Sequence, residues 1–94
     1  MLSENIRNLR KIFNISQVDL ASSLGVTKQC VSNWENDNIL PSIEMLVKIA
    51  KFFNVSTDYL LDLNSSKVID VSDLDENEIA HIKFIVQDLK RIKD

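Results

Sequence analysis

SQVDLASSLGVTKQCVSNWEN, residues 16–36, is the stretch of this sequence that decides the fold. Gly25, the only glycine of the chain, separates two short segments whose apolar residues recur at helical spacing. A glycine at that point adopts positive φ without a Cβ penalty, so the chain can turn sharply. Ala21, four residues earlier, is small enough for two helices to pack closely. The stretch therefore predicts helices over residues 17–24 and 28–35 joined by a tight turn.

Residues that suit the N-cap, the position just before a helix, recur along the chain. They suit it because their short side chains accept hydrogen bonds from the free amides of the first turn. They are Ser16, Thr27, Ser42, Ser56 and Asp75. At four of these caps, an apolar residue just before the cap pairs with an apolar residue four positions after the cap. This pairing is called a hydrophobic staple. Together with the apolar periodicity, the caps predict further helices over residues 4–13, 43–53, 57–61 and 76–92.

Composition supports a small all-α protein. The 94 residues include one Gly and one Pro, too few chain breakers for a turn-rich sheet. Cys30 and His81 are the only residues of their kinds, which excludes an intrachain disulfide and a structural zinc site within one chain. We expect no metal, cofactor or small-molecule ligand. The sequence has no apolar run of membrane-spanning length and no export signal, so we expect a cytoplasmic protein without a membrane partner.

Polar side chains occupy one continuous face of the predicted helix over residues 28–35. Val31 and Trp34 fall on the inward face, which leaves four residues at i, i+1, i+4 and i+5 pointing outward: Lys28, Gln29, Ser32 and Asn33. Lysine can hydrogen-bond guanine, and the amides of Asn and Gln can bond adenine through two contacts. The helix therefore suits reading of base edges in duplex DNA.

Residues 1–63 resemble the phage repressor and Cro class of helix-turn-helix domains, the lambda-repressor-like or XRE family. The spacing of Ala21, Gly25 and Val31 is the core of that resemblance. Further matching residues are Ser16-Gln17, Leu20, Val26-Thr27, Trp34-Glu35-Asn36, Pro41-Ser42 and Tyr59-Leu60-Leu61. The resemblance implies a five-helix bundle that binds double-stranded DNA as a regulator of transcription.

The resemblance also implies a role for each matching residue. Gln17 would contact the DNA backbone, Thr27 would cap the second helix of the motif and bond a phosphate, and Asn36 would hold a phosphate just beyond it. Lys28, Gln29, Ser32 and Asn33 would face bases or flanking phosphates in the major groove. Arg10 and Glu35 match a pair that forms a partly buried salt bridge in some relatives.

Two features depart from the family pattern. Asp37 stands where the family often has a glycine, close to the expected path of the DNA. Residues 1–63 carry six Lys and Arg residues against seven Asp and Glu residues, and the whole chain has a net charge of −3. Nucleic-acid binding usually shows a basic balance. Binding must therefore depend on local placement of charge and on neutral donors, and we expect either low affinity or a need for dimerisation.

The predicted helix over residues 76–92 is amphipathic, with its apolar residues within about 140° of the helical wheel. They are Ile79, Ile82, Ile85, Val86, Leu89 and Ile92. We interpret residues 64–74 as a linker and residues 75–94 as a dimerisation element. The alternative is that the helix covers the bundle within the same chain.

These observations predict a homodimeric transcriptional regulator, more specifically a repressor, that acts on a near-palindromic operator with residues 28–35 in the major groove. Occupation of the operator is sufficient for repression, and no acid-base or nucleophile pair is evident. We therefore expect no enzyme and no catalytic residue. The rival hypothesis is a protein-interaction module, antirepressor-like or antitoxin-like, that uses the helix over 76–92 as its docking element. The acidic balance is its main support.

Overall fold

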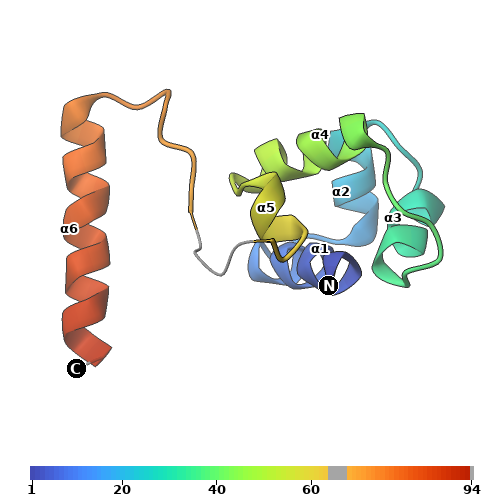
Figure 1. The fold of residues 1–94 in the computed structure, drawn as a ribbon, viewed down its shortest axis with the longest axis horizontal. Helices are drawn as coiled ribbons and strands as arrows, with labels where there is room; N and C mark the ends of the chain where they lie inside the picture. The colour runs from blue at the N-terminus through green and yellow to red at the C-terminus, as the bar shows by residue number, and fades with distance from the viewer. Residues whose placement is uncertain (64–67, 94) are drawn as a thin grey trace.

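Six α-helices occur within residues 1–63 and 68–93, the parts of the chain that this computed structural model describes. They are α1 (Leu2–Ile12), α2 (Gln17–Leu24), α3 (Lys28–Glu35), α4 (Ile43–Phe53), α5 (Thr57–Leu60) and α6 (Glu76–Lys93). Helices α1–α5 gather into one bundle, and α6 stands apart from it at the end opposite α3 (Figure 1). The predicted all-α architecture is confirmed, with a five-helix bundle followed by one longer helix.

Side-chain caps begin helices α2–α6 as the sequence predicts. The hydroxyl groups of Ser16, Thr27, Ser42 and Ser56 accept hydrogen bonds of 3.0–3.2 Å from backbone N–H groups three residues later. At α6 the carboxylate of Asp75 accepts from the N–H of Glu78, whose own carboxylate accepts from the N–H of Asp75. Each cap satisfies an amide that the first turn of a helix leaves free, so the starts of these five helices follow from the sequence.

Asparagine and aspartate residues end several helices in place of glycine. Asn14, Asn54 and Asp62 have φ values of 56° to 58°, in the left-handed region. These short polar side chains tolerate that conformation better than other non-glycine residues. A chain with a single glycine thus still obtains the tight turns that a bundle of short helices requires.

The core lies between the helices of the bundle and is lined by apolar residues from all five. The fully buried side chains of the core belong to α1, α2, α3, α4 and α5: Ile6, Leu20, Val31, Ile49, Phe53 and Leu60. Helix α1 begins two residues earlier than predicted and ends at Ile12. Phe13, which the pattern placed inside that helix, lies just beyond it and meets Phe53 edge to face at 5.0 Å between ring centroids. Helix α5 ends one residue earlier than predicted, at Leu60.

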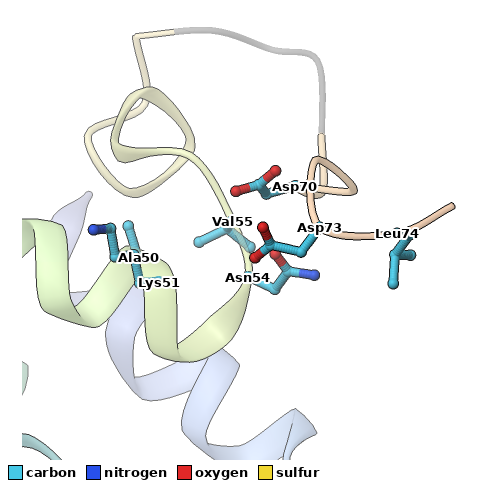
Figure 2. Close-up of a pocket in the computed structure, with 7 residues that line it drawn as sticks. All are labelled: Ala50, Lys51, Asn54, Val55, Asp70, Asp73 and Leu74. Carbon is cyan, nitrogen blue, oxygen red and sulfur yellow. The ribbon is translucent and has the colours of Figure 1, made fainter.

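Residues 68–74 return to the bundle before α6 begins. Ile69 forms an antiparallel β-bridge with Val55, in the turn between α4 and α5. The hydroxyl and N–H of Ser72 donate to Asp70, and these bonds lower the pKa of that carboxyl. Figure 2 shows Asp70 and Asp73 beside the end of α4, where they line a cavity of about 580 Å³. Of the residues interpreted as a linker, 64–67 lie outside the described residues.

None of the helices in residues 1–63 and 68–93 combines the length and the apolar character needed to cross a membrane.

Candidate nucleic-acid interface

The turn between α2 and α3 has the geometry that the sequence predicts for Gly25. This residue has φ 74° and ends α2, and the N–H of Val26 donates to the carbonyl of Ala21 at 2.9 Å. No heavy atom lies within 4 Å of the place where a Cβ would stand. Glycine is therefore favoured here by the backbone conformation and not by lack of space. Leu20, Leu24 and Val31 pack beneath the turn and hold the two helices together.

One face of α3 is free of the core. Lys28 and Gln29 are exposed, Ser32 and Asn33 are half-buried, and Asn36 follows the helix as an exposed residue. The side chains form pairs one helical turn apart. Nε2 of Gln29 donates to Oδ1 of Asn33 at 3.1 Å, and Nδ2 of Asn36 donates to Oγ of Ser32 at 3.2 Å. The structure thus brings all four predicted base-facing residues onto one face. The Gln29–Asn33 and Asn36–Ser32 bonds were not predicted from the sequence.

The amino end of α3 combines several features that favour an anion. Thr27 accepts a hydrogen bond from the N–H of Cys30 at 3.1 Å, which leaves its hydroxyl proton available to a further acceptor. The first-turn N–H groups of a helix carry a partial positive charge, and no acidic residue stands in the first turn of α3. Lys28 adds a full positive charge at the same end. This end of α3 suits a phosphate oxygen.

Glu35 lies at the centre of an ionic network that joins the first three helices. Its side chain is 2% exposed, and its carboxylate accepts from Nε and Nη2 of Arg10 at 2.7 and 3.1 Å. Nε2 of Gln17 donates to the same carboxylate at 3.2 Å, and Arg7 donates to the backbone carbonyl of Glu35. The hydrogen bond to Glu35 raises the pKa of Arg10. The network fixes the position of α3 relative to α1 and α2.

The sequence indicated the Arg10–Glu35 pair but not the other two members of this network. Arg7 precedes Arg10 by three residues on α1, so the two share a face, and this spacing is the signal that was available. Gln17 was assigned only to the DNA backbone. Its bond to Glu35 uses one N–H and leaves the second N–H and the carbonyl oxygen for a ligand.

Asp37 adopts a left-handed conformation, with φ 60°. The N–H of the next residue, Asn38, donates to the carbonyl of Asn33 at 2.9 Å and closes the end of α3. This is the backbone geometry that favours glycine, which explains physically why the resemblance leads one to expect a glycine here. Asp37 keeps the fold of the turn while it adds an exposed negative charge beside the polar face of α3.

Helix α6 divides the predicted dimerisation residues into two groups. Ile79, Ile82 and Val86 line an apolar groove with Ile69 and Val71 of their own chain, where Ile79 and Ile82 are half-buried and Val86 is 42% exposed. The other three are 48–80% exposed: Ile85, Leu89 and Ile92. The chain thus covers only part of the apolar face of α6.

Comparison with known proteins places the bundle in a family. Residues 6–60 match the helix-turn-helix family. An uncharacterised helix-turn-helix transcriptional regulator of Bacillus subtilis is 32% identical over 63 residues, which cover 67% of this chain and 56% of that protein. The chain thus spans little more than half the length of this relative.

Two solved structures extend the comparison. The P22 c2 repressor in complex with a synthetic operator is 35% identical with a TM-score of 0.62, over 64% of this chain and 91% of the other. A transcriptional regulator from Listeria innocua is 26% identical with a TM-score of 0.65, over 98% of this chain and 94% of the other. The second likeness includes the region of α6.

Proposed function

This chain belongs to the helix-turn-helix family, whose matching relatives include regulators and repressors of transcription, and we propose that it is a sequence-specific repressor that binds an operator as a homodimer. The observation that supports this most directly is the polar outer face of α3, held by a complete helix-turn-helix. No step of chemistry is required, because a protein that occupies an operator blocks or redirects polymerase by position alone.

Binding proceeds by placing α3 in the major groove. Gln29 and Asn33 then face base edges, and Lys28 faces a guanine or a phosphate. Thr27, with its free hydroxyl proton, and Asn36, just beyond the helix, hold the phosphates on either side. Gln17 reaches the backbone from the start of α2. Phosphate contacts of this kind fix the register of the protein, and the base contacts supply specificity.

The excess of acidic residues in the chain does not lie on the outer face of α3. Glu35 is the only acidic residue within α3, and it points inward, where Arg10 neutralises it. The outer face of α3 therefore carries the positive charge of Lys28 and the partial charge of the helix end, and the exposed carboxylate of Asp37 follows two residues after the helix. Because the positive charge on this face is small, DNA binding is favoured for two copies of the domain over one: dimerisation doubles the favourable contacts.

The exposed half of α6 is the surface we assign to dimerisation. A contiguous apolar patch on a soluble protein marks an interaction site when it is large, and burial of such a side chain contributes about 1.5–3 kcal/mol. Pairing of two such faces can therefore outweigh the entropy of association. A two-fold dimer would present two α3 helices to successive major grooves, about 34–36 Å apart, on a near-palindromic site.

Binding is tested by titrating the full chain onto genomic fragments at low and physiological salt. We expect selected fragments to shift, with weaker binding at higher salt. Replacement of Lys28 by Ala separates its two possible roles: loss of preference at one base pair indicates guanine reading, and a uniform loss with a shallower salt slope indicates phosphate binding. Absence of any shift at low salt would favour the rival protein-interaction module.

Dimerisation is tested with two acidic substitutions on α6. The double change Ile85→Glu and Leu89→Glu should abolish the dimer in sedimentation and weaken operator binding. Phe84→Glu is the matched control, because Phe84 is 65% exposed and lies off the apolar stripe. It should leave both measurements unchanged. A monomeric unmodified chain, or a double variant that still dimerises and binds equally well, would assign α6 another role.

A further inference from the structure

The bond between Gln29 and Asn33 restricts what the outer face of α3 can present to a ligand. Nε2 of Gln29 donates to Oδ1 of Asn33 at 3.1 Å across one turn of the helix. A primary amide has two N–H donors and one carbonyl oxygen. Gln29 is thus left with one N–H and its carbonyl oxygen, while one lone pair of Asn33 is occupied. The two free groups of Gln29 lie side by side when the N–H trans to the oxygen makes the bond to Asn33.

The remaining groups of Gln29 match one base in the major groove. Adenine presents an acceptor, N7, beside a donor, the N6 amino group, and so pairs with an N–H beside a carbonyl. Guanine presents two acceptors, N7 and O6. An amide recognises these only if it turns both N–H groups toward the base. Gln29 cannot do so while one N–H is bonded to Asn33.

We propose that Asn33 is a positioning residue that fixes the amide of Gln29 and thereby makes it selective for adenine over guanine. This inference rests on the proposed function, since it requires α3 to lie in the major groove. It goes beyond that function because it predicts that substitutions of Gln29 and of Asn33 change the preference at the same base pair. When Asn33 is removed, Gln29 can pivot and offer both N–H groups, so guanine becomes acceptable at that position.

The neighbouring pair on the same face supplies a matched control. Ser32 accepts from Asn36 and does not contribute to the Gln29–Asn33 bond. Ser32→Ala therefore removes a polar group from the same surface of α3 without releasing Gln29. Asn33→Asp supplies the rescue, because a carboxylate keeps the acceptor that holds Gln29 while its negative charge weakens binding to every sequence.

The experiment begins with selection of bound duplexes from a random library by the full-length protein. The base pair read by Gln29 is the one whose preference disappears in Gln29→Ala. Affinities for duplexes with adenine or guanine at that position are then measured for the unmodified chain and each variant. A good two-contact pair discriminates by about 5- to 150-fold, and we expect a ratio in this range for the unmodified chain.

Asn33→Ala should reduce this ratio to below about threefold, a loss of most of that discrimination. Asn33→Asp should keep the ratio at lower overall affinity. Ser32→Ala should also keep the ratio, while any DNA contact of Ser32 itself would lower the affinity for both duplexes equally. The inference is overturned if Asn33→Ala weakens both duplexes equally, if it changes the preference only at a different base pair, or if Gln29 reads a base other than adenine. Failure of the unmodified chain to bind any duplex would instead refute the proposed function itself.

Discussion

Removal of Glu35 should destabilise the bundle more than removal of any exposed charge. Glu35→Ala deletes the carboxylate that accepts two bonds from Arg10 and one from Gln17. The guanidinium of Arg10, whose side chain is 15% exposed, then keeps only its bond to the carbonyl of Ile15. A charge left without its partner in a buried site typically costs about 3–5 kcal/mol.

That cost is large for a domain of this size. At about 0.05–0.15 kcal/mol per residue, a 60-residue bundle has a total stability of about 3–9 kcal/mol. Glu35→Ala should therefore remove a third or more of it, and should lower the melting temperature by about 12 °C or more. The double variant Arg10→Met, Glu35→Leu should lose less than Glu35→Ala alone, because it leaves no stranded charge.

Urea unfolding at 25 °C, followed by circular dichroism, measures these free energies. Glu44→Ala is the matched control, an exposed glutamate in the first turn of α4, and should cost less than about 1 kcal/mol. A loss below about 1 kcal/mol for Glu35→Ala would show that the network contributes little. A double variant whose loss equals the sum of the losses of Arg10→Met and Glu35→Leu measured singly would show that Arg10 and Glu35 act independently.

Two further substitutions test single features of the motif. Asp37→Asn keeps a residue that tolerates positive φ and removes a negative charge beside α3, so operator titration should show tighter binding, more so at low salt. Asp58→Asn, an exposed change on α5, should not alter binding. Asp19 lies in the capping box of α2, where the hydrogen bond from the N–H of Ser16 lowers its pKa below the ordinary 3.8. Its stabilisation is therefore present above that value and is lost as pH falls through the lowered pKa. The difference in melting temperature between the unmodified chain and Asp19→Ala should accordingly shrink from about pH 5 to about pH 2, and a constant difference would contradict this role.

The bundle could be predicted from sequence because its signals are local. The caps at Ser16, Thr27, Ser42 and Ser56 set the starts of four helices to the residue, and Gly25 set the turn between two of them. Helix α1 was placed less well. Its preceding residue, Met1, makes no side-chain cap, so the sequence holds no comparable mark of where that helix begins.

The network around Glu35 and the amide pairs on α3 were harder to predict. Gln17 lies 18 positions before Glu35, and only the packed arrangement of α2 and α3 brings the two side chains together. The bond from Gln29 to Asn33 spans one turn and so was geometrically available, but exposed amides at that spacing equally bond to water. Composition and periodicity indicate which face is polar, and they do not indicate how its amides are oriented.

The bridge between Val55 and Ile69 has a consequence for how two half-sites are spaced on DNA. Residues 70–75 alone separate that bridge from α6, so α6 leaves the bundle on a short tether. In the proposed dimer, a short tether limits rotation of one bundle relative to the other as well as the distance between them. Insertion of about five base pairs between the half-sites turns one of them to the opposite side of the duplex. On such an operator only one bundle of the dimer should bind its half-site. Insertion of a full helical turn should leave both half-sites on the same side of the duplex.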